Sequence, residues 1–272
     1  MPLSVMTLNI WNYEGPWAER LDMIRGWIGL LEPDLIGLQE VLLGESYDQA
    51  AEIFDGFDYH LDYDGPMAYW NDESLQFGNL VGSRWPIAAT EHVLLPMAGR
   101  TDQRVLLCAD VESPHGRIPF YVTHLTARPY DGWIREQQVQ VIGEKILSNR
   151  TRDTLPAILC GDFNAEPDST EMRYLRGLHS LGGRSLFLLD AWAIAGGGGD
   201  GYTFTRQTPY RHYRQADQRF DYIYVERAES DRIRIAHCGL VCNVPRQGLY
   251  PSDHMGLFME LSLPGDAPLT GR

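Results

Sequence analysis

Short apolar runs that end in a polar residue recur along the first part of this chain. Val5 to Ile10 and Leu35 to Val41 are two such runs, each long enough for a buried strand. Between them, apolar residues recur at helical spacing from Trp17 to Leu31, directly after Pro16, and proline is favoured at the start of a helix. The opening of the chain therefore predicts a strand, a helix and a second strand.

The same pattern continues through the rest of the chain. Further strands are expected at residues 57–61, 79–83, 105–111, 118–124, 155–161, 221–225, 233–241 and 255–263. Two more helices are expected, one at about residues 132–148 and one at about residues 169–178, the second with Ser169 as its N-terminal cap. Many strands with few helices indicate an α/β protein whose sheets are partly antiparallel.

No linker-like segment divides the 272 residues. The glycine-rich run at residues 196–201 is short and is typical of a loop. With 44% hydrophobic residues, a chain of this length can bury a large core. We therefore expect a single domain over residues 1–272, with its core at about residues 3–263.

The chain is acidic, with 23 Lys and Arg against 37 Asp and Glu and a formal net charge of −14. Such a surface repels a polyanion, which disfavours a nucleic-acid partner without excluding one. Part of the acidic excess can belong to a cation site, because clustered carboxylates repel one another until a metal joins them. Surface acids that serve solubility explain the same excess, and composition does not separate the two.

The N-terminal residues lack a basic leader and a long apolar segment, so no signal peptide is expected. No stretch approaches transmembrane length. The four cysteines are few, and Cys108 and Cys160 lie in strand-like runs, which is typical of buried free thiols in a reducing compartment. Cys238 and Cys242 have no second Cys/His pair at zinc-site spacing. We therefore expect a cytoplasmic protein.

Polar residues with catalytic chemistry lie at the ends of the expected strands. They are Asn9, Glu40, His124, Asp162, Asn164, Asp221, Asp253 and His254. Any one of them alone is typical of a cap or turn residue. Together they lie where catalytic groups gather in α/β folds, at the junctions of strands and loops. Asp162 and Asn164 are two residues apart, so in extended chain their side chains point the same way.

The four acids of this set, Glu40, Asp162, Asp221 and Asp253, are hard oxygen donors suited to Mg²⁺ or Mn²⁺. Four carboxylates that converge in one cleft need positive charge nearby, and a divalent cation supplies it. The sequence therefore predicts a divalent-metal site.

Seven segments resemble a known family, and they occur in the order of that family's conserved blocks. The segments are LNIWN, LQEV, GNLVGSRWPI, THLTA, GDFNAEP, RFDYIYV and SDHMGL. They resemble the endonuclease/exonuclease/phosphatase superfamily, which includes DNase I-like nucleases, deadenylases, inositol polyphosphate 5-phosphatases and sphingomyelinases. The resemblance implies an α/β four-layer sandwich of two packed mixed β-sheets flanked by helices, with metal-dependent phosphoester hydrolysis at one rim.

The resemblance also implies a metal site. Glu40 is implied as the principal metal ligand, with Asn9 beside it. Asp253 is implied to supply or support a second metal contact. Mg²⁺ is the implied cofactor, with Mn²⁺ as the alternative.

For the remaining residues the resemblance implies contacts to water and phosphate. Asp162 would orient or deprotonate the attacking water, while Asn164 and His124 would donate hydrogen bonds to the non-bridging phosphate oxygens. His254, held by Asp221, would act as acid/base or as a further donor. Which of Asp162 and His254 is the effective base stays open.

Three further residues are weaker candidates for substrate binding, namely Asn79, Arg84 and Arg135. Arg84 precedes Trp85 and Pro86 and is equally typical of a structural ion pair, and Arg135 can reach a phosphate or belong to a solvated surface. The aromatic segment at residues 63–70 is typical either of a substrate-contacting loop or of core.

We therefore expect a divalent-metal-dependent phosphoester hydrolase, and foremost a phosphodiesterase. A nuclease that acts on DNA or RNA is the first alternative, and a catalytically silent scaffold or binding protein with the same fold is the second. The expected partner is a phosphoester substrate, either a small molecule, a lipid headgroup or a nucleic acid, and no protein partner is implied.

Overall fold

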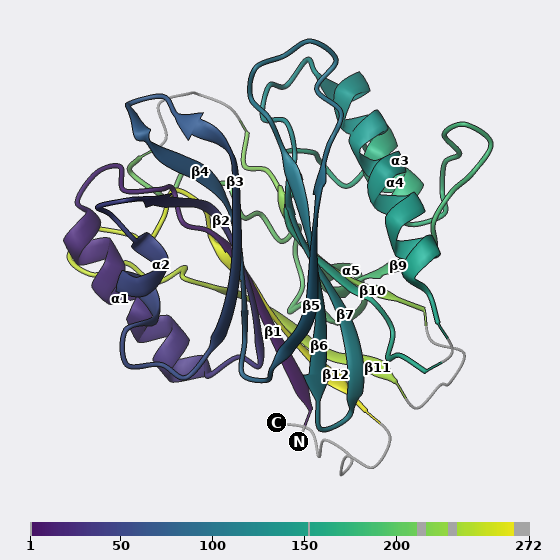
Figure 1. The fold of residues 1–272 in the computed structure, drawn as a ribbon, viewed down its shortest axis with the longest axis horizontal. Helices are drawn as coiled ribbons and strands as arrows, with labels where there is room; N and C mark the ends of the chain where they lie inside the picture. The colour runs from purple at the N-terminus through teal and green to yellow at the C-terminus, as the bar shows by residue number, and fades with distance from the viewer. Residues whose placement is uncertain (1, 152, 211–215, 228–232, 264–272) are drawn as a thin grey trace.

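Two six-stranded sheets pack face to face in this protein (Figure 1), whose computed structural model describes residues 2–151, 153–210, 216–227 and 233–263. The first sheet has the strand order β11-β12-β1-β2-β4-β3 and the second β5-β6-β7-β8-β10-β9. The first comprises β1 (Leu3–Asn9), β2 (Leu35–Gly44), β3 (His60–Tyr69), β4 (Asp72–Ser83), β11 (Arg234–Val241) and β12 (Gly256–Ser262). The second comprises β5 (Ile87–Leu94), β6 (Val105–Ser113), β7 (Gly116–His124), β8 (Ile158–Asp162), β9 (Leu188–Asp190) and β10 (Asp221–Glu226).

Both sheets are mixed. In the first, β1 pairs in parallel with β2 and antiparallel with β12. In the second, β7 pairs in parallel with β8, and β8 pairs antiparallel with β10. Because β1 and β12 are neighbours, the two ends of the described chain belong to one sheet.

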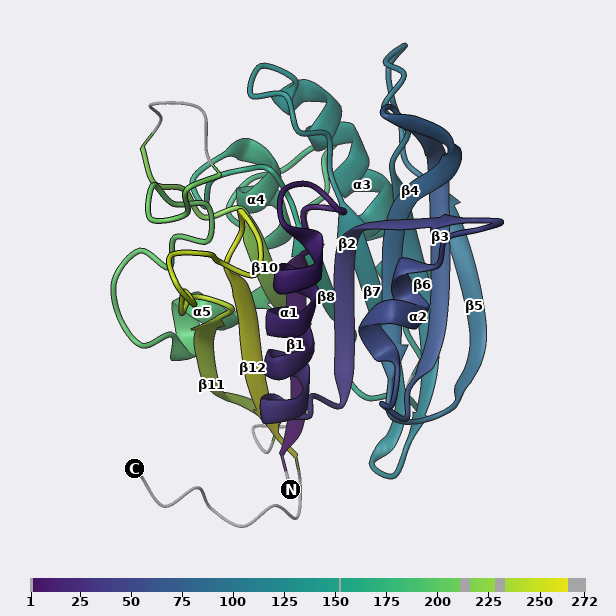
Figure 2. The same ribbon diagram turned by 90° about the vertical axis from the view of Figure 1, so that its left-hand side faces the viewer.

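Helices cover the outer face of each sheet (Figures 1 and 2). The helices are α1 (Trp17–Leu31) and α2 (Gln49–Phe54) on the first sheet, and α3 (Gly132–Asn149) and α4 (Thr170–Leu175) on the second. The short α5 (Ala191–Ala195) adds Ala191 to the core between the sheets. Helix, sheet, sheet and helix form four layers, so the predicted four-layer sandwich is confirmed.

Alternation along β1 explains how one strand serves two apolar layers. Leu3 and Val5 point into the core between the sheets, whereas Met6 and Leu8 point into the core beneath α1 and α2. The sheets approach each other closely at Gly37, where a Cβ atom would lie 2.6 Å from Sγ of Cys160. A side chain at position 37 would therefore push the sheets apart.

Most of the predicted elements are present with shifted ends. The helix expected near residue 169 spans only Thr170–Leu175, and the side chain of Ser169 makes no capping hydrogen bond. The strand expected at 57–61 begins at His60 and continues to Tyr69, so most of the aromatic segment at 63–70 is strand. The sequence did not predict α2, α5, β5 or β9. Three of these, α2, α5 and β9, are short, and β5 is almost wholly exposed.

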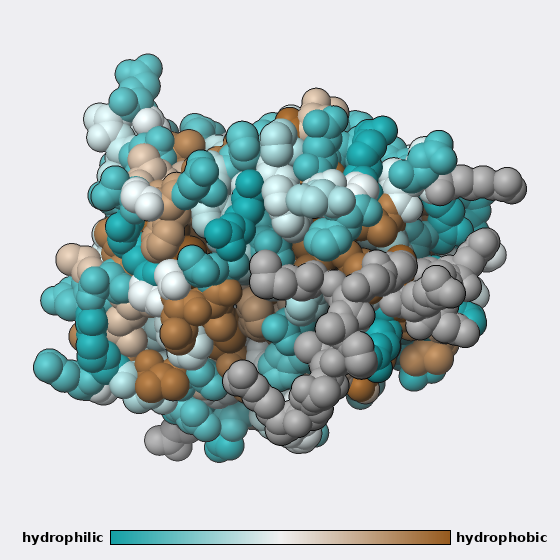
Figure 3. Space-filling view, turned by 90° about the horizontal axis from the view of Figure 1, so that it is seen from below, coloured by the Kyte–Doolittle hydropathy of each residue, from teal (hydrophilic) through white to brown (hydrophobic). Residues whose placement is uncertain are grey.

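The end of the sandwich at which β1 begins presents a mixed surface of hydrophilic and apolar residues (Figure 3). The predicted catalytic and metal-binding residues lie toward the other end, where β1, β7 and β8 terminate. No helix in the described part of the chain is long and apolar enough to cross a membrane. The four cysteines are free and buried.

Candidate active site

Strand register brings the predicted residues of the second sheet together. His124 ends β7 and lies opposite Asp162, which ends the parallel strand β8. Asp221 begins β10 and lies opposite Asp162 from the other side, because β10 is antiparallel to β8. Three polar side chains thus meet at one edge of the sheet, and all three are buried.

A bulge in β2 turns Glu40 toward the same place. Ile36 and Leu38 point into the core beneath the helices, and strict alternation would send the side chain of residue 40 there as well. Instead the pairing with β4 shifts between Gln39 and Val41, and Glu40 adopts a left-handed backbone with φ 63°. This single extra residue places the carboxylate on the inner side of the sheet.

Asn9 links the two sheets. Its Nδ2 donates to Oε1 of Glu40 at 3.1 Å and to Oδ2 of Asp162 at 3.0 Å. Asn12, which we did not predict, donates from Nδ2 to Oε2 of Glu40 at 3.0 Å and is buried. Both carboxylate oxygens of Glu40 are therefore held in place, and the side chain is still partly open to solvent. The only signal for Asn12 in the sequence is that it closes the LNIWN segment.

His254 and Asp221 form a buried hydrogen-bonded pair. Nδ1 of His254 lies 2.8 Å from Oδ2 of Asp221, and Nε2 lies 3.7 Å from Oδ2 of Asp162. Burial lowers the pKa of His254, but the surrounding Asp221, Asp162 and Asp253 outweigh it and raise the pKa well above 6.5. The imidazole is therefore held in its charged form.

Asp162 and Asn164 lie on a sharp turn after β8. The backbone N–H of Asn164 donates to Oδ1 of Asp162 at 2.9 Å, and Nδ2 of Asn164 donates to the carbonyl oxygen of Leu125 at 3.1 Å. An amide NH₂ has two N–H donors, so one remains for a ligand. Gly161 (φ 146°) is required in this motif, because a Cβ would lie 1.9 Å from the carbonyl oxygen of Thr123.

Burial makes ionisation of the clustered acids unfavourable. Burial raises the pKa of Asp253 to about 6, and the nearby charge of Glu40 adds to the effect. Burial likewise raises the pKa of Glu40 and of Asp162. A divalent cation stabilises the ionised form of clustered hard oxygen donors whose ionisation burial makes unfavourable. The residues present therefore fit a hard divalent metal.

A second grouping of possible ligands overlaps the first. Ligand atoms of Asp162, Asp221 and His254 lie within 4.8 Å of one another. The ring of His254 is engaged by an aspartate at each nitrogen and carries a proton, which leaves it no lone pair for a metal. Glu40 and Asp253 are the better ligands on this ground.

His124 completes the cluster. Its Nε2 lies 3.5 Å from Oδ2 of Asp162, and its Nδ1 has no hydrogen-bond partner among the described residues. Burial, together with the charges of Arg104 and His254, lowers the pKa of His124 well below 6.5. This imidazole is therefore neutral beside the charged one.

The three weaker candidates lie differently. Asn79 is buried next to His124 and donates from Nδ2 to the carbonyl oxygen of Val105 at 3.1 Å, across the two sheets. Arg84 is exposed and its backbone N–H bonds the carbonyl oxygen of Asp34, just before β2 begins, which is the end opposite to Glu40. The structure does not bring Arg84 to the site.

Arg135 does not point at the cluster either. Its Nε donates to Oε1 of Glu171 at 2.7 Å, and its Nη1 donates to the carbonyl oxygens of Thr126 and Arg128. The side chain is 5% exposed. Arg135 therefore forms a buried ion pair with Glu171 and holds the segment after β7. The structure does not direct it to the site as a substrate contact.

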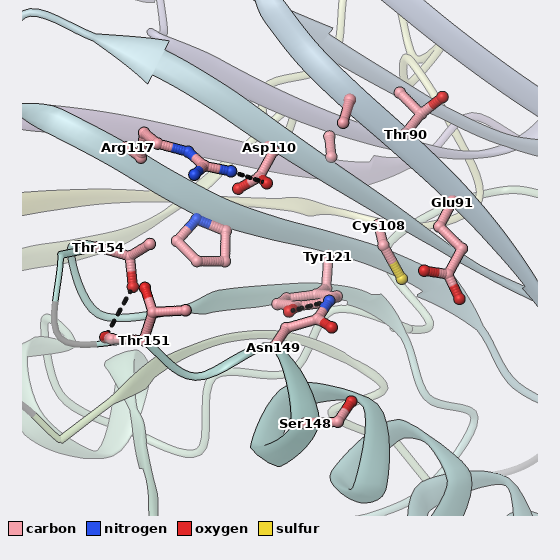
Figure 4. A pocket seen from close by; sticks show the side chains of 13 residues that line it. Thr90, Glu91, Cys108, Asp110, Arg117, Tyr121, Ser148, Asn149, Thr151 and Thr154 are labelled. Carbon is pink, nitrogen blue, oxygen red and sulfur yellow. Dashed lines mark hydrogen bonds and ion pairs between the residues drawn. The ribbon is translucent and has the colours of Figure 1, made fainter.

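A separate cavity lies on the outer face of the second sheet (Figure 4). It has a volume of about 380 Å³ and is lined by Cys108, Arg117, Tyr121 and Asn149 among others. Its Arg117 is paired with Asp110, and its Asn149 donates to the hydroxyl of Tyr121. No residue of the carboxylate cluster lines it, so the chemistry belongs to the rim and not to this cavity.

With this geometry in place, comparison with known families gives one match across most of the chain. Residues 6–254 match the endonuclease/exonuclease/phosphatase family. The chain belongs to this family. The family resemblance that the sequence motifs indicate is thereby confirmed.

Individual relatives of this endonuclease/exonuclease/phosphatase protein are distant. The nocturnins of Rattus norvegicus and Mus musculus are each 25% identical to it over 273 residues and 90% of this chain. The chain spans 59% and 58% of the lengths of these two curated relatives.

Solved structures confirm the DNase I-like fold. D. rerio TDP2 in complex with a single-strand DNA product matches with a TM-score of 0.74 and 21% identity, covering 96% of this chain and 98% of that one. A Beutenbergia cavernae endonuclease/exonuclease/phosphatase matches with a TM-score of 0.73 and 24% identity, covering 99% and 73%. At such identities the likeness concerns the fold alone.

Proposed function

We propose that this protein is a Mg²⁺-dependent phosphodiesterase that cleaves its substrate by direct attack of water on phosphorus. The observation that carries the proposal is the joining of Glu40 and Asp162 through Asn9 beside the His254–Asp221 pair. This arrangement combines oxygen ligands for a metal, a base for water and a cationic donor within one cleft.

Glu40 and Asp253 are the residues that would hold the cation, with Asn9 fixing the orientation of Glu40. Burial is the main cause of the raised pKa values of both carboxyls, so their ionised forms need a positive charge nearby. Mg²⁺ suits such hard oxygen donors, and Mn²⁺ is expected to replace it. When bound, the cation polarises a phosphoryl oxygen and neutralises the charge that develops in the transition state.

Asp162 is the proposed base. Its raised pKa lies closer to neutral pH than that of an ordinary aspartate, which is the range in which a general base is effective. The two hydrogen bonds from Asn9 and from the backbone of Asn164 fix the carboxylate. A water between Asp162 and the phosphorus would pass its proton to this carboxylate as the new P–O bond forms.

His254 is the proposed acid. Asp221 orients the ring at Nδ1 and keeps it protonated, so that Nε2–H faces the cleft. Both pKa values are raised, but that of His254 lies above that of Asp162, so the imidazole can donate a proton while the carboxylate accepts one. The Nε2 proton would pass to the leaving oxygen as the P–O bond breaks, or would stabilise a non-bridging oxygen. The free N–H of Asn164 and the neutral His124 are further donors to that oxygen.

A nuclease is the second candidate. The D. rerio TDP2 structure that shares this fold contains a single-strand DNA product. Against it stands the net charge of −14, which disfavours a long polyanion and favours a small phosphodiester or a lipid headgroup. A catalytically silent scaffold is disfavoured, because all eight residues of the predicted catalytic and metal set are present.

The state of the cysteines bears on the cellular compartment of the protein. The four cysteines are buried free thiols, which is typical of proteins in a reducing compartment. We infer a cytoplasmic protein on this basis.

A substrate panel under one metal condition tests the proposal. The hydrolysis of each substrate would be measured with Mg²⁺ at about millimolar concentration, which suits a weakly held ion, and again with EDTA. The panel comprises bis-p-nitrophenyl phosphate, nucleotides, inositol phosphates, sphingomyelin, RNA, and single- and double-stranded DNA. Hydrolysis of at least one diester, lost in EDTA and in Asp162→Asn, supports the proposal. Diester hydrolysis that survives chelation would refute the metal-dependent mechanism.

A further inference from the structure

A small cleft opens beside His124, between β4 of the first sheet and β6 and β7 of the second. It is lined by Pro66, Phe77, Gly78, Asn79, Gln103, Arg104, Val105 and His124. Its volume is about 10 Å³. A cavity needs about 10–15 Å³ to hold one water-sized group, so this cleft has room for a single oxygen atom and not for a base or a sugar.

Arg104 is the charged residue of this cleft. Its side chain is 7% exposed, and its Nε is buried without a hydrogen-bond partner among the described residues. The nearest carboxylate oxygen, Oδ2 of Asp102, lies 3.8 Å from Nη2, which is too far for a hydrogen bond. The guanidinium carbon lies 6.0 Å from the centre of the Phe77 ring.

Other buried arginines of the described chain are better satisfied. Arg20 donates to five backbone carbonyls, including those of Ile10 and Pro251. Arg219 makes two hydrogen bonds to Asp190 through its Nη atoms, although its Nε also has no partner among the described residues, and Nε of Arg135 donates to Glu171. A buried charge is normally paired and hydrogen-bonded, because its removal from water is otherwise costly. Arg104 therefore has an N–H donor, at Nε, that no described residue accepts.

The charge of Arg104 acts on the catalytic cluster. It interacts electrostatically with Glu40 and Asp162. After burial, it is the largest cause of the lowered pKa of His124, and so it helps to keep that imidazole neutral. The cleft therefore adjoins the place where the phosphate of the proposed reaction would lie.

We propose that Arg104 binds a non-bridging oxygen of the substrate phosphate, which enters the cleft beside His124. This inference rests on the proposed phosphodiesterase function and names the cation that recognises the phosphate there. The guanidinium N–H without a partner donates to the oxygen, and His124 lies on the same wall. A charge-assisted hydrogen bond of this kind contributes about 10- to 100-fold in binding.

Two variants, Arg104→Met and Arg104→Lys, separate this role from a structural one. Arg104→Met keeps the length of the side chain and removes the charge. We expect kcat/KM for bis-p-nitrophenyl phosphate to fall about 10- to 100-fold, with an equal loss in the affinity for orthophosphate measured by calorimetry. We expect Arg104→Lys to recover part of both. The melting temperature should stay level or rise, because a poorly paired buried charge has been removed.

Arg135→Met is the matched control, since it removes a buried arginine that is held by Glu171 and by two backbone carbonyl oxygens. Its melting temperature should fall, while orthophosphate affinity measured below that temperature stays at the wild-type value. Unchanged orthophosphate affinity and kcat/KM in Arg104→Met would overturn the inference, as would a fall in melting temperature like that of Arg135→Met without loss of binding. If the wild-type protein cleaves no diester yet binds orthophosphate through Arg104, the proposed function fails and the inference stands.

Discussion

Asn9 and Glu40 lie 3.1 Å apart, Nδ2 to Oε1, because β2 contains one residue more than the strand it pairs with at that point. Without the bulge, the carboxylate would point into the apolar core beneath the helices. The left-handed backbone of Glu40 is uncommon for a residue with a side chain, and such strain is found where function requires it. The geometry of the proposed metal site therefore depends on this backbone irregularity as much as on the side chains.

Asn12→Ala should weaken metal binding more than it weakens catalysis at saturating metal. Asn12 holds the second oxygen of Glu40, and loss of a group that orients a ligand costs about 10- to 100-fold in metal affinity. The apparent Kd for Mg²⁺ would be read from activity as a function of metal concentration. Tyr69→Phe is the milder control, because the Tyr69 hydroxyl donates to Oδ1 of Asn12 and to Oε1 of Glu14 and accepts from Nδ2 of Asn71, and its loss leaves the hydrogen bond from Asn12 to Glu40 in place. Equal Mg²⁺ affinity in Asn12→Ala and wild type would contradict this role.

Asp253→Asn should stabilise the metal-free protein, and more so at high pH. Burial raises the pKa of Asp253 to about 6 from an ordinary value of 3.8, so the folded state favours the protonated acid. The contribution of the protonated Asp253 carboxyl to the free energy of unfolding is fully present below pH 3.8 and is lost as the pH rises through 6. The loss amounts to up to about 3 kcal/mol, less the screening that partial exposure to solvent provides.

The comparison is made by thermal denaturation in EDTA. The melting temperature of Asp253→Asn minus that of wild type should be larger at pH 7.5 than at pH 5, since other groups cancel in the difference. Mg²⁺ should raise the melting temperature of wild type and not of the variant. A difference that shrinks as the pH rises would show that Asp253 is not held protonated by burial.

Asp221→Asn should impair the acid without dismantling the site. The amide keeps the shape of Asp221 but removes the charge that keeps the pKa of His254 high. We expect kcat to fall about 10²- to 10⁴-fold, the range attributed to a general acid. The imidazole of His254, followed by NMR, should lose its proton at a lower pH than in wild type. An unchanged His254 titration would exclude Asp221 as the orienting partner.

Asn164→Asp replaces a donor with a negative charge at nearly constant size. Asp tolerates the left-handed backbone that Asn164 adopts (φ 49°), so the fold should persist. Turnover should fall far more than the melting temperature, because a carboxylate would face the phosphate. A variant that unfolds readily yet keeps normal specific activity would show Asn164 to be a structural turn residue.

The strands and the identity of the clustered residues followed from the sequence because both depend on local pattern. Alternation along β1 and the polar ends of β7 and β8 are visible in the residues themselves. The exposed edge strand β5 was missed, because an edge strand with almost no buried residue lacks the apolar pattern that marks a strand. The bulge at Glu40 was equally invisible, since it arises from pairing between β2 and β4.

The roles of the arginines required the structure. Arg135 was a weaker candidate for substrate binding, with a solvated surface position as the alternative, but its partner Glu171 lies 36 residues away and no local pattern joins the two. Arg104 was overlooked because an arginine before an apolar run is typical of a strand end. Only the packing of β4 against β6 and β7 places it beside His124.

The most direct test of the account is the Mg²⁺ dependence of bis-p-nitrophenyl phosphate hydrolysis by wild type and by Glu40→Gln. The amide keeps the hydrogen-bonding shape of Glu40 and removes the charge that would hold the cation. We expect wild-type activity to saturate with Mg²⁺ and to vanish in EDTA. The variant should need at least about 10-fold more metal or show no activity at any concentration. Wild-type activity and metal dependence in Glu40→Gln would contradict the proposed metal site.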